Sequence, residues 1–277
     1  MHGCRTRWTV ALVTVTAALV LVGITRVEAI TYGSVDGSRH PNVGTMVAGL
    51  SDGRVIQFCS GTLIAPTVFL TAAHCTAFLD YAQTQGILAW LAVSFQSAPP
   101  HADPYLYYGT HVTNPNYTPL GVDHGDVAVV LLNKAPTGVE PARLPTAGMF
   151  DAWFGAGRRI VKDLRFTPVG YGALEPHFGG GPPTWPSSGG SRYYGYSRFA
   201  AMDKVWMHLQ ANQATGDSNT CFGDSGGPNF LWQDGEETDI IAGVTVKGDP
   251  LCVATNVIYR LDIPGARDFL GQFVTLP

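Results

Sequence analysis

Short runs of apolar residues, separated by turn-forming residues, recur along most of the chain. Val, Ile, Leu, Thr and aromatic residues dominate these runs, and such residues fit the pleated surface of a β-strand. The runs cover residues 57–64, 67–70, 87–95, 127–132, 193–210, 240–246 and 256–261. Loop signals such as Pro99-Pro100 and Asn114-Pro115 lie between them. The pattern predicts an all-β chain.

The C-terminal segment has a different period. Asp262 and Pro264 are typical of a helix start. The apolar residues that follow share one helical face: Ala266, Phe269, Leu270 and Phe273. Because that face must be buried, we expect a terminal helix that packs on the strands and whose aromatic residues belong to the core.

A connection rich in proline, alanine and glycine lies between the two groups of strands. It runs from Asn133 to Arg159, and it holds no catalytic candidate. We therefore expect two structural units, residues 30–145 and residues 146–277. A second segment of biased composition, Gly179 to Gly190, predicts a flexible loop at which proteolytic cleavage would concentrate.

Residues 1–29 are typical of a secretory signal peptide. Two arginines precede an almost wholly apolar run of 17 residues, Trp8 to Ile24, and Val27-Glu28-Ala29 supplies the small residues that a signal peptidase recognises. The run is at the short edge of what can span a bilayer, so a retained membrane anchor is one alternative. Cleavage after Arg26 is another. We expect a secreted, extracellular protein with no stable membrane anchor after signal removal.

Composition and charge narrow the class of protein. The chain is 45% hydrophobic and 14% charged, as expected of a globular domain. The predicted leader holds three of the 17 basic residues and one of the 21 acidic residues, so the remainder carries 14 basic and 20 acidic residues and a net charge of about −6. This charge argues against nucleic acids and anionic membrane surfaces as partners.

Residues 221–228, CFGDSGGP, place Ser225 among glycines on an expected exposed turn. A serine hydroxyl becomes a strong nucleophile only when an imidazole takes its proton and a carboxylate orients that imidazole. His74, in TAAHC, and Asp126, at the start of DVAVV, are the candidates. Asp123 is the alternative acid, but Asp126 directly precedes an apolar strand in which a carboxylate can be buried. Asp123 and His124 are expected to be surface loop.

The segments TAAHC, DVAVV and GDSGGP, in this order, resemble the motifs of the chymotrypsin/trypsin family of secreted serine endopeptidases. The resemblance covers residues 30–277. It implies two packed antiparallel six-stranded β-barrels with a C-terminal helix, the histidine and aspartate in the first barrel, and the serine and specificity pocket in the second. It also implies polypeptide substrates, proteinaceous inhibitors as further partners, a monomer, and no cofactor.

The resemblance further implies the role of each residue. Ser225 attacks the acyl carbon, His74 takes and returns the proton, and Asp126 holds His74. The backbone N–H groups of Gly223 and Ser225 form the oxyanion hole. Thr245 corresponds to a serine whose hydroxyl binds the triad acid, and threonine keeps that hydroxyl.

Four cysteines remain outside the predicted leader, and an even number in an exported chain indicates disulfides. Spacing alone leaves all three pairings open. The resemblance implies Cys59–Cys75 and Cys221–Cys252. Zinc binding is the competing use of cysteine, but the chain has no Cys-x-x-Cys pair and its histidines are scattered, so we expect no metal site.

Residues 30–33, Ile-Thr-Tyr-Gly, are similar to the Ile-Val-Gly-Gly start of activated family members. In the family the new α-ammonium pairs with the acid just before the nucleophile, which makes Ile30 and Asp224 the expected activation pair. The predicted signal-peptidase cleavage and this terminus coincide at Ile30, which leaves no room for a propeptide. We therefore hypothesise that secretion itself activates the enzyme.

The predicted specificity pocket departs from that of trypsin. Its floor, six residues before the nucleophile, is an aspartate in trypsin-like members and Asn219 here. The wall that is Ser-Trp-Gly in the family resembles Thr245-Val246-Lys247, and Asn256 replaces a deeper glycine. A neutral floor and a narrower, cationic mouth favour neutral or small residues before the scissile bond rather than Arg or Lys. Asp217 is expected to face away from the pocket.

Two other functional classes fit parts of the pattern. A catalytically weak or inactive homologue that acts as a binding module would usually lack a triad member, and all three are present. An esterase or lipase would carry its serine in Gly-x-Ser-x-Gly, which residues 223–227 satisfy. In those enzymes the histidine comes last, however, and here His74 precedes Ser225.

Overall fold

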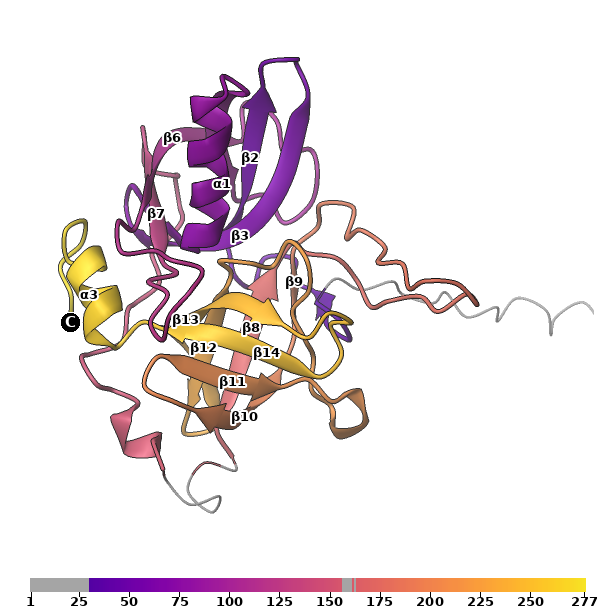
Figure 1. Cartoon of the computed structure of the whole chain (residues 1–277), viewed down its shortest axis with the longest axis vertical. Coiled ribbons are helices and arrows are strands. Elements are labelled where there is room, and N and C mark those ends of the chain that lie inside the picture. The colour runs from indigo at the N-terminus through magenta and orange to yellow at the C-terminus, as the bar shows by residue number, and fades with distance from the viewer. Residues whose placement is uncertain (1–29, 156–160, 162) are drawn as a thin grey trace, which may run out of the picture.

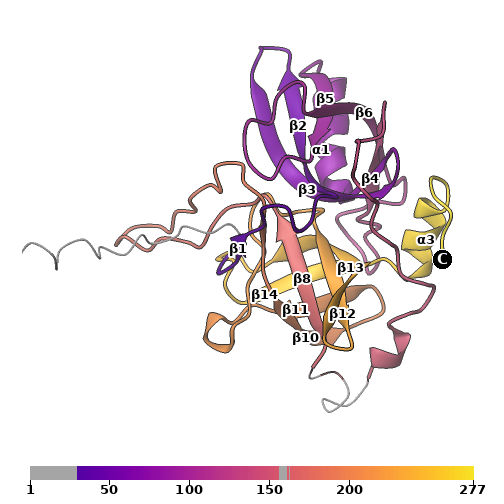
Figure 2. The same ribbon diagram turned by 180° about the vertical axis from the view of Figure 1, so that it is seen from behind.

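Two β-barrels lie side by side in the molecule (Figure 1 and Figure 2), and each barrel is formed by one half of the chain. The computed structural model describes residues 30–155, 161 and 163–277, so the predicted signal peptide lies outside the described residues. The expected all-β class with two six-stranded barrels and a C-terminal helix is confirmed. The first barrel ends with residue 132 and the second begins with residue 165.

The first barrel is closed and antiparallel, in the order β2-β3-β4-β7-β6-β5. Its strands are β2 (Val43–Leu50), β3 (Val55–Ala65), β4 (Val68–Thr71), β5 (Leu88–Ser94), β6 (Leu106–Thr113) and β7 (Ala128–Leu132). A helix, α1 (Ala73–Thr84), follows β4 and packs along the outside of β5, β6 and β7.

The second barrel has the order β8-β10-β11-β14-β13-β12 and closes through the pairing of β12 with β8. Its strands are β8 (Arg165–Gly170), β10 (Ser197–Met202), β11 (Trp206–Gln210), β12 (Pro228–Gln233), β13 (Glu236–Gly248) and β14 (Thr255–Arg260). Two short strands, β9 (Tyr193–Tyr194) and β1 (Ser34–Val35), extend this sheet beyond β8. Two 3₁₀ helices, η1 (Asp151–Trp153) and η2 (Gln213–Thr215), lie in the connections.

The terminal helix α3 (Pro264–Leu270) begins with proline in its first turn, where the missing N–H costs no hydrogen bond. Ala266, Phe269 and Leu270 are buried, and Phe273 packs against the same cluster, so the predicted apolar face is core. In the described part of the chain, no helix is long and apolar enough to cross a membrane.

The interface between the barrels is a shared apolar core. Val43, Leu70 and Val129 reach it from the first barrel, and Val244 and Tyr259 reach it from the second. Separate clusters fill each barrel, one around residues such as Leu63 and Phe69 and one around residues such as Phe166 and Met207. Loops that border the shared core are therefore held between two packed bodies.

A buried arginine adds polar contacts to this interface. The Arg192 side chain is 2% exposed. Its Nε donates to Asp36 Oδ2 (2.7 Å), and its Nη1 donates to the carbonyl oxygens of Val43 (2.8 Å) and Phe95 (3.2 Å) and to the Tyr171 hydroxyl (3.1 Å). One guanidinium thus ties the N-terminal segment, the first barrel and the second barrel together.

Some of these elements depart from the sequence pattern. Helix α1 and strands β2, β6, β8 and β12 were not among the predicted elements, although the buried stripe of α1 has helical spacing: Ala73, Cys75, Thr76, Leu79 and Ala82. The segment Gly179 to Gly190, which was predicted to be a loop, lies outside the helices and strands, in an arm where isolated bridges join Ala173 to Ser187 and His177 to Thr184.

Candidate active site

His74 and Asp126 meet because their strands are paired. Thr71, the last residue of β4, lies opposite Ala128, the first residue of β7. The residues just after β4 and just before β7 therefore emerge at the same end of the barrel. Asp126 Oδ2 lies 3.0 Å from His74 Nδ1, and Asp126 Oδ1 accepts a hydrogen bond from the His74 backbone N–H at 2.9 Å.

The environment of Asp126 favours one form of the imidazole. The Asp126 side chain is only 4% exposed, while His74 is half-buried. A buried carboxylate that faces Nδ1 stabilises the tautomer with the proton on that nitrogen. Nε2 is then left without a proton and can act as a base.

Asp123, the alternative acid, lies elsewhere. Its Oδ1 accepts hydrogen bonds from the Tyr259 hydroxyl (2.8 Å) and from the Gly125 N–H (2.9 Å). Burial, together with the neighbouring Asp123 carboxylate, raises the pKa of Tyr259 far above its ordinary value. Asp123 therefore ties its exposed loop to the second barrel, and it is Asp126 that contacts His74.

The serine turn is fixed by glycines and by the first barrel. Gly226 has φ +80°, and a Cβ there would lie 2.2 Å from Thr71 Oγ1, so no larger residue fits without a shift. The Ser60 N–H donates to the Ser225 carbonyl oxygen (2.8 Å), and Ser60 Oγ donates to the Gly223 carbonyl oxygen (2.9 Å). Strand β3 thus holds the turn from across the barrel interface.

Ser225 also lies next to the residue that follows His74. Its carbonyl oxygen is 3.9 Å from Cys75 Sγ, and Ser225 itself is partly exposed. The structure therefore brings the serine turn of the second barrel to the end of the first barrel that carries His74 and Asp126.

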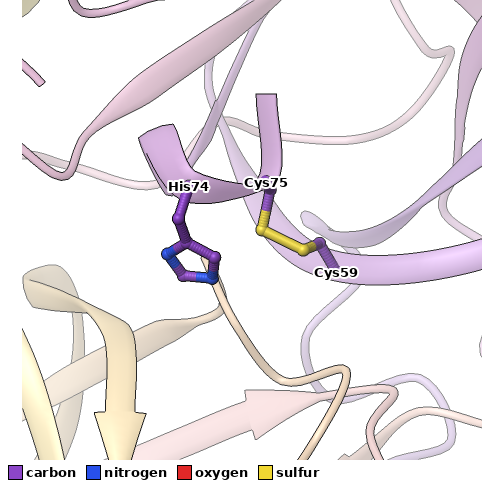
Figure 3. A group of neighbouring side chains, drawn as sticks. All are labelled: Cys59, His74 and Cys75. Carbon is purple, nitrogen blue, oxygen red and sulfur yellow. A yellow bond between two sulfur atoms is a disulfide. The ribbon is translucent and has the colours of Figure 1, made fainter. Parts of the chain in front are cut away.

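Both disulfides implied by the resemblance are present, Cys59–Cys75 and Cys221–Cys252. Figure 3 shows the first beside the His74 imidazole. In the described residues, the only cluster with metal-ligand atoms within reach of one another is Cys59, His74 and Cys75. Since its two sulfurs are bonded to each other, this cluster offers no thiolate for a metal.

Asp224 is fully buried, and its carboxylate accepts two backbone hydrogen bonds. Gly172 N–H donates to Oδ1 and Cys221 N–H donates to Oδ2, both at 2.8 Å. Glycine is required at position 172 because a Cβ there would lie 2.5 Å from the carboxylate. Burial outweighs the two N–H donors and raises the pKa of Asp224 to about 7. Within the described residues, no cation pairs with this carboxylate.

Ile30 is buried against residues from the second half of the chain. It is 0% exposed and packs with Leu174 and Tyr193. The next residue, Thr31, accepts a hydrogen bond at its carbonyl oxygen from the Asn219 N–H (3.0 Å). In this chain Ile30 follows Ala29 through a peptide bond, so it has no free ammonium to offer to Asp224.

The predicted pocket residues include two buried asparagines. Asn219 and Asn256 are each 0% exposed. Asn219 Nδ2 donates to Asp249 Oδ2 (3.4 Å), and Asn256 Nδ2 donates to Asn229 Oδ1 (2.9 Å). The Oδ1 atoms of both Asn219 and Asn256 are buried and have no partner in the described part of the chain. Such orphan acceptors are costly unless a ligand supplies a donor.

In the predicted pocket wall, Thr245 does not make the contact with the acid Asp126 that the resemblance implies. The Thr245 hydroxyl accepts a hydrogen bond from Asn229 Nδ2 (3.0 Å), and no bond from it to Asp126 is found among the described residues. Val246 is partly buried, and Lys247 Nζ lies 4.7 Å from the centre of the Trp206 ring. The cation is therefore at the surface over an aromatic face.

Asp249 contacts the predicted pocket residue Asn219 and was not predicted from the sequence. Burial alone would raise its pKa, but the backbone N–H groups of Ala254, Thr255, Val253 and Leu251 lower it below the ordinary value. The Asp249 carboxylate, which accepts from Asn219 Nδ2, therefore favours its ionised form and is already surrounded by backbone donors. Asp217 is paired with Arg198 (2.8 Å), as expected for a residue that faces away.

Comparisons with known proteins agree with this architecture. The family model described as Trypsin matches residues 35–261. A solved structure of an HL collagenase has a TM-score of 0.62 and 18% identical residues, over 88% of this chain and 97% of that chain, and at this identity the likeness concerns the fold. No curated protein matches the chain. Because the family model covers most of the sequence, the chain belongs to the trypsin family and is a serine-type endopeptidase.

Proposed function

We propose that this protein is a secreted endopeptidase that hydrolyses peptide bonds through an acyl-enzyme on Ser225. The observation that supports it best is the pairing of His74 Nδ1 with the buried Asp126 carboxylate at 3.0 Å. That pairing leaves Nε2 as a base at the end of the first barrel where the serine turn docks.

The reaction follows from these positions. His74 Nε2 takes the Ser225 proton as the hydroxyl oxygen attacks the peptide carbonyl carbon, and Asp126 stabilises the imidazolium that forms. The backbone N–H groups of Gly223 and Ser225 stabilise the negative oxygen of the tetrahedral intermediate. His74 then returns the proton to the departing amine, and a water molecule, activated in the same way, releases the acyl group.

The oxyanion turn becomes competent when Ile30 is the free N-terminus. Its α-ammonium would pair with Asp224, whose buried carboxylate otherwise has only two backbone donors. Since the predicted signal-peptidase site directly precedes Ile30, export and activation would be one event. N-terminal sequencing of the secreted protein tests this. A start at Ile30 is expected, and a start upstream with activity only after a second cleavage contradicts it.

The preferred residue before the scissile bond is neutral. Asn219 and Asn256 supply neutral amide oxygens, and the Asp249 carboxylate is occupied by backbone donors. A small or neutral side chain with an N–H or O–H group would satisfy the orphan oxygens. A peptide library with strong cleavage after Arg or Lys would contradict this preference.

A fluorophosphonate probe tests the catalytic assignment. Labelling of the secreted protein should be lost in Ser225→Ala, and Asp126→Asn should lower kcat on peptides roughly 10⁴-fold because it favours the wrong imidazole tautomer. Labelling that persists in Ser225→Ala would assign the nucleophile elsewhere. No labelling of the wild type at all would favour the inactive homologue that acts as a binding module.

A further inference from the structure

The Ser60 side chain is buried between the first barrel and the serine turn. Ser60 belongs to β3 and is 0% exposed. It directly follows Cys59, whose disulfide with Cys75 lies beside the His74 imidazole (Figure 3). The Ser60 hydroxyl takes no part in any step of the proposed mechanism, although its hydrogen bonds lead to the turn that carries Ser225.

A bulge in β3 turns this side chain out of the first barrel. In the pairing of β3 with β2, Thr45 lies opposite Ser60 and Met46 lies opposite Phe58, so Cys59 is an extra residue on β3. Cys59 has φ +35°, which is uncommon for a residue other than glycine. In a regular strand, residues two apart share one face. Here Phe58 packs against the core of the first barrel, whereas the bulge directs Ser60 to the second barrel.

The Ser60 hydroxyl joins two segments from the second half of the chain. Its oxygen accepts a hydrogen bond from the Tyr171 N–H (3.0 Å), and it donates its proton to the Gly223 carbonyl oxygen (2.9 Å). A serine hydroxyl has one proton to donate, so its donor capacity is fully used here. Among the described residues, no other donor to the Gly223 carbonyl oxygen is found. The hydroxyl therefore bridges the residue after β8 and the serine turn.

The peptide planes on the two sides of Gly223 are each held by one hydrogen bond. The Ala173 N–H donates to the Phe222 carbonyl oxygen (2.7 Å), which fixes the plane that contains the Gly223 N–H. The Ser60 hydroxyl fixes the next plane through the Gly223 carbonyl oxygen. Gly223 has φ +100°, and glycine offers little steric resistance to rotation. The hydrogen bonds, rather than a side chain, thus set the direction of both planes.

The direction of these planes matters for the oxyanion hole of the proposed mechanism. Its two donors are the N–H groups of Gly223 and Ser225, and such donors stabilise the transition state only if they point at the oxygen that becomes negative. The Ser60 N–H also donates to the Ser225 carbonyl oxygen (2.8 Å). One residue of the first barrel therefore constrains both donor residues, Gly223 through its hydroxyl and Ser225 through its backbone.

We propose that Ser60 is a positioning residue for the Ser225 reaction, because its hydroxyl holds the Gly223 peptide so that the Gly223 N–H points at the oxyanion. The inference rests on the proposed function, which places the oxyanion at Gly223 and Ser225. Ser60 touches no reacting atom and acts through the turn alone. Loss of its hydroxyl should weaken binding of the transition state and leave binding of the substrate in the ground state unchanged.

Ser60→Ala tests this inference, with kcat and KM measured on peptides and the number of active sites set by titration with the fluorophosphonate probe. We expect kcat to fall about tenfold, the scale of one lost buried hydrogen bond, and KM to stay within about twofold. The Ki of a peptidyl trifluoromethyl ketone, whose adduct with Ser225 places an oxyanion in the same hole, should rise by the factor by which kcat/KM falls. Ser60→Thr, which keeps the hydroxyl, should stay closer to the wild type in kcat than Ser60→Ala does.

The matched control is Ser94→Ala. Ser94, in β5, is also 0% exposed, but its hydroxyl bonds to His101 Nδ1 (2.9 Å) and to the Gln96 N–H (3.3 Å) instead of the serine turn. This variant should unfold at a lower urea concentration than the wild type, yet keep its kcat and Ki.

Four results would overturn the inference and leave the proposed function intact. They are a wild-type kcat in Ser60→Ala, a rise in KM without a fall in kcat, a kcat in Ser60→Thr as low as in Ser60→Ala, and an equal fall of kcat in Ser94→Ala. If the wild type is neither labelled by the probe nor able to cleave peptides, the inference and the proposed function both fail.

Discussion

The buried carboxylate of Asp224 gives the molecule a pH-dependent stability that its N-terminus should control. Burial raises the pKa from 3.8 to about 7. For a group whose folded-state pKa is raised, the stability present below the unfolded pKa is lost as the pH rises through the folded pKa. At about 1.4 kcal/mol per pH unit between the two pKa values, and less where either state is half ionised, the free energy of unfolding should fall by about 3 kcal/mol between pH 4 and pH 7.

This loss applies to a chain in which Ile30 is still acylated, such as one that begins at Val27. In a chain that begins at Ile30, the α-ammonium would pair with Asp224, stabilise the ionised form and lower its pKa again. The slope between pH 4 and pH 7 should then disappear. The two chains differ by only three residues, so their other titrating groups are the same except for Glu28 and the terminus.

Urea unfolding at several pH values measures the effect, with Ser225→Ala in both chains to prevent autolysis. Asp224→Asn is the control, because it removes the titrating group and should make the two chains respond alike to pH. An equal slope for the chains that begin at Val27 and at Ile30 would refute the pairing. A flat slope in both would show that Asp224 titrates at its ordinary pKa.

Three further changes probe the interface and the turn. Arg192→Met should lower the free energy of unfolding by about 3 kcal/mol, because it leaves Asp36 buried with one partner fewer; a urea midpoint equal to that of the wild type contradicts this. Gly226→Ala should lower kcat by at least about 10²-fold through displacement of the turn, while Gly37→Ala, also at positive φ but with open space around it, should keep activity. Burial would lower the pKa of His40, but Asp36 and Glu237 outweigh it and raise the pKa. The stability that protonated His40 adds below about pH 6.5 should therefore be lost as the pH rises through the raised folded-state pKa. In His40→Gln, the free energy of unfolding measured in urea should fall less with pH above about pH 6.5 than it does in the wild type.

Two strands with a continuous apolar run were predicted nearly to their ends, whereas strand β2, which contains two glycines, was not predicted. Residues 127–132 and 256–261 correspond to β7 and β14 within one residue at each end. Strand β2 was missed because Gly44 and Gly49 break its apolar run. In the structure these glycines allow close packing: a Cβ at Gly49 would lie 2.1 Å from the Trp90 ring. Glycine there serves a contact between strands, which the sequence alone does not distinguish from a turn.

Some residues of the candidate site could likewise be predicted from the sequence, and others could not. The segments around His74, Asp126 and Ser225 could be found because the chemistry requires particular residue types in a short motif. Asp249 could not, since its ionised state depends on four backbone N–H groups that only the folded loop directs at it. The Thr245 hydroxyl likewise faces Asn229, a partner that no motif names.

The fold explains why the site depends on contacts remote from the reacting atoms. The first barrel holds His74 and Asp126 through the pairing of β4 and β7, whereas Ser225 belongs to the second barrel. In the proposed mechanism neither barrel contains a complete proton relay, so the geometry of the relay would be set by the interface between the barrels. That interface consists of the shared apolar core, the Ser60 bonds to the serine turn, and the Arg192 contacts. A change that loosens any of these should therefore reduce stability and catalysis together, even where it touches neither the imidazole nor the hydroxyl.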